Sequence, residues 1–131
     1  MPVLGTKGAN LDILIRQGAT FGPVIARLKD NNGNPVNITG CTLRAQIRKT
    51  PTSTLVDGAT AVFDITDPTN GIFTFEFTAE VTTLLTADSE SETAPASIYV
   101  WDMEMQDSSG RVTALVYGKV NVFREVTKST P

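Results

Sequence analysis

The chain has 131 residues and a mass of 14.0 kDa, the size of one domain, and 40% of its residues are hydrophobic, too many for a disordered chain. It contains no histidine and one cysteine, which excludes a histidine general base, a disulfide framework and a zinc site built from several cysteines. The net charge of −3 does not favour binding to phosphate backbones, so we expect a scaffold or binding module with no nucleic-acid partner.

The chain carries no membrane or targeting signal. No run of about 18 apolar residues occurs, so no membrane partner is expected. The first residues lack the apolar stretch of a signal peptide, so we expect the protein to stay in the compartment where it is made, a reducing cytoplasm. Cys41 is expected to remain a thiol there and to act as a small, buried hydrophobic residue.

The first half of the chain alternates apolar and polar residues in short segments, the pattern of half-buried strands. Three strands are expected there: 11–16, 20–28 and 41–48. Pro23 cannot donate to a ladder, so it predicts a bulge or a sheet edge. Residues 1–10 show no alternation and are expected to form an arm outside the fold, ordered only when docked on a partner. Residues 49–60, rich in Pro, Ser and Thr, are expected to form a loop.

The second half continues the alternation. Four more strands are expected: 61–66, 72–78, 97–106 and 111–124. The last is too long for one regular strand, and Gly118 is expected to mark a bulge that bends it. One or two helical turns are expected over 79–85, with Val81, Leu84 and Leu85 covering the core.

These segments predict an all-β fold: a single antiparallel, immunoglobulin-like β-sandwich of about seven strands with a short helical turn. The sandwich is expected to span residues 11–128. Residues 1–10 form the N-terminal arm in this prediction, and residues 129–131 form a C-terminal tail. A small closed barrel is the alternative architecture.

No catalytic, metal or cofactor site is expected. Asp30 to Asn34 resembles the start of a calcium loop, but Pro35 and Cys41 occupy the positions that need Gly and Glu. Asp102 and Glu104 share one strand face about 7 Å apart, within the range of paired carboxylates in glycoside hydrolysis. An acidic, solvated strand face is the commoner explanation of that pair, so an enzyme is not expected.

Two sets of charged residues are candidate assembly contacts. Basic side chains gather on or beside the polar face of strand 41–48: Arg44, Arg48 and Lys49. Acidic side chains gather in the polar loop before strand 97–106: Asp88, Glu90 and Glu92. We expect the basic face of one copy to receive the acidic loop of another chain, which would fix orientation more than affinity. Ordinary solubilising charge is the alternative explanation.

The order of turn and strand signals carries a family resemblance. Gly18-Ala19-Thr20-Phe21 precedes Asp30-Asn31-Asn32-Gly33-Asn34-Pro35, which leads through Thr39-Gly40 to the strand with Leu43-Arg44. Later signals complete the order: Ile65-Thr66-Asp67, Gly71, Tyr99-Val100-Trp101-Asp102-Met103, Gly110-Arg111-Val112 and Gly118-Lys119-Val120-Asn121-Val122. Over residues 11–128 this order resembles small immunoglobulin-like structural domains of tailed bacteriophages, including the N-terminal domain of baseplate upper proteins.

The resemblance implies a non-enzymatic part of a virion, found in the tail, baseplate, neck, fibres or capsid. Its implied partners are other virion proteins and copies of itself in a symmetric assembly, after synthesis in the cytoplasm of a host bacterium. Some family members continue into a fibre or receptor-binding region, whereas this sequence ends at Pro131. That difference favours the role of an adaptor, a decoration protein or a fibre anchor.

A carbohydrate-binding β-sandwich module is the alternative function. It would require aromatic side chains that face the solvent: Tyr99, Trp101 or Tyr117. The alternation of apolar and polar residues predicts that the first two are buried.

Overall fold

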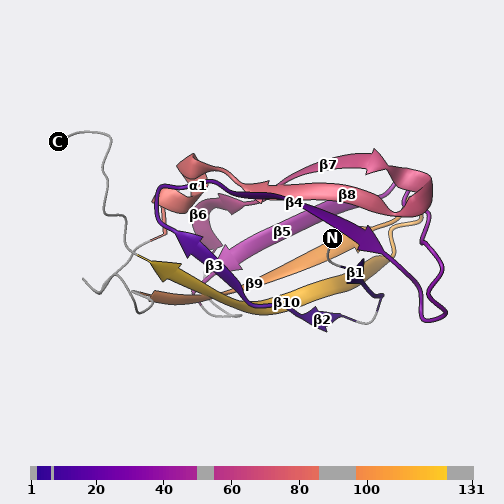
Figure 1. Ribbon diagram of the computed structural model, residues 1–131, viewed down its shortest axis with the longest axis horizontal. Coiled ribbons are helices and arrows are strands. Elements are labelled where there is room, and N and C mark those ends of the chain that lie inside the picture. The colour runs from indigo at the N-terminus through magenta and orange to yellow at the C-terminus, as the bar shows by residue number, and fades with distance from the viewer. Residues whose placement is uncertain (1–2, 7, 50–54, 86–96, 124–131) are drawn as a thin grey trace.

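Two β-sheets pack face to face as a sandwich-like fold (Figure 1). The computed structural model describes residues 3–6, 8–49, 55–85 and 97–123. The first sheet has the order β1 (Val3–Leu4), β4 (Phe21–Leu28), β8 (Ile72–Phe77), β7 (Val62–Asp67). The second sheet has the order β2 (Ala9–Asn10), β10 (Val112–Phe123), β9 (Ser97–Gln106), β5 (Thr42–Arg48), β6 (Leu55–Thr60), and β3 (Ile13–Arg16) also pairs with β10.

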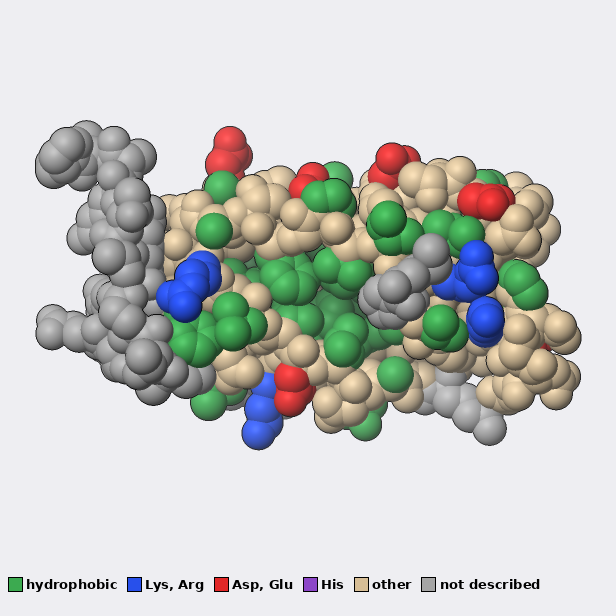
Figure 2. Space-filling view, viewed as in Figure 1, with side chains coloured by type: hydrophobic (Ala, Val, Ile, Leu, Met, Phe, Trp, Pro, Cys, Tyr) green, Lys and Arg blue, Asp and Glu red, His purple; other side chains and the backbone are tan. Residues whose placement is uncertain are grey.

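The core forms where the expected apolar faces of the two sheets meet. Phe73, Phe75 and Phe77 of β8 are buried, as the spacing of two predicts. On β9 four residues at the same spacing of two are buried as well: Tyr99, Trp101, Met103 and Met105. The Trp101 ring stacks on Phe75 at 5.9 Å and meets Phe77 edge-on at 6.2 Å, which joins the two sheets. Figure 2 shows hydrophobic side chains gathered between the two layers.

The sheets are mixed, which corrects the expectation of an antiparallel sandwich. β1 runs parallel to β4, and both β2 and β3 run parallel to β10. The remaining strand pairs are antiparallel. The parallel pairs all involve the N-terminal strands, which cross from the first sheet to the second and form one edge of each sheet.

The expectation that residues 1–10 lie outside the sandwich is wrong for the residues described there. Leu4 is 3% exposed, and its carbonyl accepts a hydrogen bond from the Lys29 backbone N–H at 2.9 Å. Ala9 and Asn10 pair with β10. Strands of two residues are too short to show alternation, so the sequence pattern could not predict them. The expected tail, residues 129–131, lies outside the described residues.

Two features of the sheets differ from their expected places. β6 lies within 49–60, which was expected to be a loop, and it pairs with β5. β10 runs on through Gly118, and its register shift falls between Ala114 and Val116 instead. Leu115 and Val116 are consecutive buried residues, as a bulge allows. The bulge expected at Pro23 is confirmed by a register shift between Phe21 and Val24.

The expected helical turn is present as α1 (Ala79–Thr83). The Thr78 hydroxyl caps it by accepting a hydrogen bond from the Val81 N–H. Leu85 is buried as expected, but Leu84 is 47% exposed because the helix ends before it. A short 3-10 helix, η1 (Pro68–Asn70), joins β7 to β8. Among the described residues, no helix has the length and apolar character needed to cross a bilayer.

Candidate functional site

The outer face of the second sheet gathers most of the polar residues that the sequence indicated. Cross-strand register places Gln46, Asp102, Tyr117 and Asn10 in one row over β5, β9, β10 and β2. The row on one side holds Arg48, Val100 and Lys119, and the row on the other side holds Arg44, Glu104 and Ala114. Side chains in register on one face of a sheet are direct neighbours, so these rows define the chemistry of the surface.

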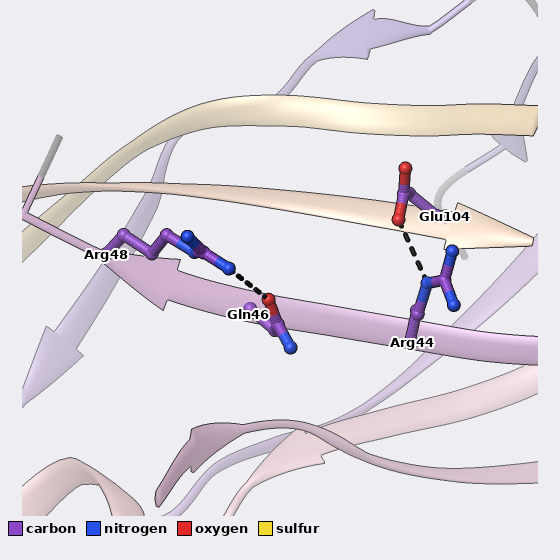
Figure 3. A network of polar contacts seen from close by, with 4 residues as sticks. All are labelled: Arg44, Gln46, Arg48 and Glu104. Atoms are coloured by element: carbon purple, nitrogen blue, oxygen red, sulfur yellow. Dashed lines mark hydrogen bonds and ion pairs between the residues drawn. The ribbon is translucent and has the colours of Figure 1, made fainter. Parts of the chain in front are cut away.

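Arg44 pairs with Glu104 on this face (Figure 3). Its Nε donates a hydrogen bond to Glu104 Oε1 at 2.9 Å, with both side chains partly exposed. An exposed pair of this kind contributes at most about 1 kcal/mol to stability. The charge of Arg44 is therefore balanced within the chain.

Of the three basic residues that were expected to act together, the structure keeps Arg44 and Arg48 on the outer face and directs Lys49 elsewhere. Arg48 lies on the outer face and donates from Nη2 to Gln46 Oε1 at 3.1 Å (Figure 3). Lys49 instead places its Nζ 5.7 Å from the centre of the Tyr99 ring, a side chain buried on the inner face. The expected acidic partners, Asp88, Glu90 and Glu92, lie outside the described residues, so a contact between these two sets stays a prediction.

A groove of about 620 Å³ runs over the rows of this outer face. Its polar lining comes from seven side chains: Asn10, Gln46, Arg48, Asp102, Glu104, Tyr117 and Lys119. The Tyr117 side chain is 55% exposed, whereas Tyr99 and Trp101 are buried, as the alternation predicted. An aromatic platform on this molecule can therefore use Tyr117 but neither of the other two.

Asp102 is the acidic residue of the row from Gln46 to Asn10. Its partial burial, and then the neighbouring Glu104 carboxylate, raise the pKa of Asp102, and the Arg48 and Arg44 guanidinium groups act weakly in the opposite direction. The carboxylate is therefore less favourable in the folded chain than in the unfolded chain, and this destabilising effect is present above the pKa of an unfolded Asp. This destabilising effect disappears at low pH, where the Asp102 carboxyl is protonated in both the folded and the unfolded chain.

We expect Asp102→Asn to raise the stability of the protein at pH 7, because the amide removes the charge that the groove disfavours. The gain should shrink as the pH falls and vanish below about pH 3, where the wild-type carboxyl is protonated in both states. Urea unfolding of both proteins from pH 3 to pH 8 measures this. A variant less stable than wild type at pH 7 would contradict it.

The remaining candidate groups have ordinary structural surroundings in the described residues. Burial, and then the nearby Asp107 carboxylate, raise the pKa of the Cys41 thiol, which keeps it protonated. Asp30 Oδ1 accepts hydrogen bonds from the backbone N–H groups of Asn32 and Asn34, which stabilises a tight turn at the residues that resemble a calcium loop. Across the described ranges, no three side chains of metal-binding type come together.

Sequence reasoning missed four residues of the groove: Asn10, Gln46, Val100 and Lys119. Alternation assigns each strand residue to a face but does not say which strands are neighbours, so no signal brought these residues together. Lys119 also lies next to Gly118, which sequence reasoning took for the bend of the strand.

The strands at the outer edges of the two sheets are a second candidate surface. β7 pairs only with β8, and β6 pairs only with β5, among the strands that the structure describes. An edge strand carries backbone N–H and C=O groups that can pair with another chain. On β7, Val62 is 53% exposed and Asp64 is also exposed. Figure 2 shows acidic side chains along the layer that contains β7 and β8.

Comparison with known proteins gives no family assignment. No protein-family model matches the chain, and no curated protein matches it. The fold and the surfaces described above are therefore the basis for a functional conclusion.

Proposed function

We propose that this chain is a non-enzymatic structural protein of a bacteriophage virion. It acts as an adaptor, a decoration protein or a fibre anchor in the tail, baseplate, neck or capsid. It makes protein–protein contacts with other virion proteins and with copies of itself, after synthesis in the cytoplasm of the host bacterium. The proposal rests on the family resemblance of residues 11–128 together with one structural observation, the strand order.

The strand order supports an immunoglobulin-like arrangement. In immunoglobulin domains, strands A, B, E and D form one sheet, and strands G, F and C form the other, with an added C′ in variable-type domains. Here β1, β4, β8 and β7 follow the order A, B, E, D, and β10, β9, β5 and β6 follow the order G, F, C, C′. The parallel pairing of β1 with β4 departs from the antiparallel sheets of those domains.

Fold alone does not give function, so the assembly role depends on surfaces. The edge of β7, which no other described strand covers, can add a strand from a neighbouring chain through backbone hydrogen bonds, which need no catalytic group. In a symmetric particle each such contact is repeated, and multivalency converts weak single contacts into a stable attachment.

We expect the full chain to co-purify with phage particles from the bacterium that carries its gene, and Val62→Lys to reduce its amount in the particles about tenfold or more. A lysine on the edge strand opposes the addition of another strand. The weakened contact recurs at every copy in the particle, so the effects on attachment multiply. Quantitative mass spectrometry of gradient-purified particles measures both.

Ile98→Lys is the matched control. Ile98 is 59% exposed and belongs to β9 of the second sheet, whereas β7 is an edge strand of the first sheet. Incorporation of this variant should equal that of wild type. Absence of the wild-type chain from the particles would overturn the proposed function, whereas equal incorporation of all three proteins would overturn the role of the β7 edge.

A further inference from the structure

The groove on the outer face of the second sheet has a lining that the assembly role does not explain. Gln46, Asp102, Tyr117 and Asn10 form a row across four adjacent strands. Adjacent strands lie about 4.8 Å apart, so the row is about 14 Å long and crosses the strands at a right angle. The groove volume of about 620 Å³ falls in the range of sites that bind small molecules.

The row combines one exposed aromatic ring with planar polar groups. The Tyr117 ring can pack against an apolar face of a ligand, and its hydroxyl can donate and accept hydrogen bonds. The amides of Gln46 and Asn10 offer both donors and acceptors, and the Asp102 carboxylate offers acceptors. A ligand with many hydroxyl groups and a weakly polar ring face matches this set of groups.

The charges of the groove favour a neutral ligand. Arg48 and Lys119 contribute two positive charges, and Asp102 and Glu104 contribute two negative charges, so the lining is neutral overall. A nucleic acid or an acidic peptide needs an excess of positive charge, which this surface lacks. A peptide would also need pockets for its apolar side chains, and the aliphatic lining side chain of the groove is Val100.

We infer that this groove binds a neutral oligosaccharide, which lies along the row from Gln46 to Asn10 and packs a sugar ring against Tyr117. The inference does not depend on the assembly role, which uses the edge strand β7. A chain that attaches through β7 would still present this outer face of the other sheet to the medium. The site would add glycan recognition to a protein whose other contacts are with protein.

Titration of the full ¹⁵N-labelled chain, followed by two-dimensional NMR, tests the inference. The probes are linear hexasaccharides of glucose, xylose, mannose and N-acetylglucosamine, with heparin and polygalacturonate as charged polymers. We expect at least one neutral hexasaccharide to cause saturable shifts of the Asp102, Gly118 and Lys119 amides, with a dissociation constant at or below about 1 mM. The charged polymers should cause no saturable shift at these amides.

Variants of Tyr117 distinguish binding in the groove from a nonspecific effect of the saccharides. Tyr117→Ala should weaken binding about tenfold, and Tyr117→Phe, which keeps the ring, should change it by less than about threefold. Leu14→Ala is the control, because Leu14 is also exposed on the second sheet but does not line the groove. The NMR spectrum of each variant also reports whether that variant is folded. Binding of none of the neutral probes up to about 10 mM, binding of the charged polymers alone, or equal binding by Tyr117→Ala would overturn the inference.

Discussion

Gly118→Ala is expected to lower the free energy of unfolding by about 2–4 kcal/mol, because the added methyl group has no space. A Cβ at this position would lie 2.1 Å from the Leu11 carbonyl oxygen and 2.6 Å from its carbon. The backbone of Leu11 cannot move away easily. Its N–H donates to the Tyr117 carbonyl at 2.9 Å, and the next residue, Asp12, accepts a hydrogen bond from the Lys119 N–H at 2.8 Å.

Urea unfolding measures this loss, with an expected fall of about 1 M or more in the midpoint. Gly5→Ala is the matched control, because no atom lies within 4 Å of a Cβ built there. Its backbone also lies outside the left-handed region, so the same substitution adds no strain. Equal midpoints for the two variants would show that the close approach of Leu11 to β10 is absent in solution.

Gly118 also shows what sequence reasoning could and could not predict about the fold. A glycine inside a long strand pattern indicates either a bulge or a close backbone approach, and the pattern does not distinguish them. The bulge lies at Leu115, where two consecutive buried residues break the alternation. The close approach depends on Leu11, more than a hundred residues earlier in the chain, so only the three-dimensional fold reveals it.

The faces of the strands were predictable because burial on one side imposes a period of two. That rule placed Phe73, Phe75 and Phe77 inside and Arg44 and Arg48 outside, as the structure has them. The rule fails for short or atypical strands. β1 and β2 have two residues each, and β6 lies in a segment whose Pro, Ser and Thr content is typical of a loop.

The candidate site was predictable only in part, for the same reason. Sequence reasoning placed Asp102 and Glu104 on one strand face and Arg44 on another, but the ion pair between Arg44 and Glu104 requires that β5 and β9 be neighbours. Tyr117 was a candidate aromatic residue, yet its groove forms from four strands whose order the sequence does not contain. Neighbouring strands are set by long-range packing, which a local pattern cannot report.

Trp101→Phe is expected to lower the free energy of unfolding by about 2–4 kcal/mol, although both residues are aromatic. The indole Nε1 donates a hydrogen bond to the Leu11 carbonyl oxygen at 2.8 Å, and phenylalanine has no donor to replace it. The smaller ring also leaves a void between the sheets, next to Phe75 and Phe77. The unsatisfied Leu11 carbonyl and the void both lower the free energy of unfolding, because both follow from the loss of the indole.

Met103→Leu serves as the control for Trp101→Phe in urea unfolding followed by circular dichroism. Met103 is fully buried on the same face of β9, and the exchange conserves volume and polarity, so it should cost less than about 1.5 kcal/mol. A Trp101→Phe protein as stable as the Met103→Leu protein would contradict the prediction. It would mean that the carbonyl of Leu11 finds another donor and that the N-terminal strands are not held to the second sheet through Trp101.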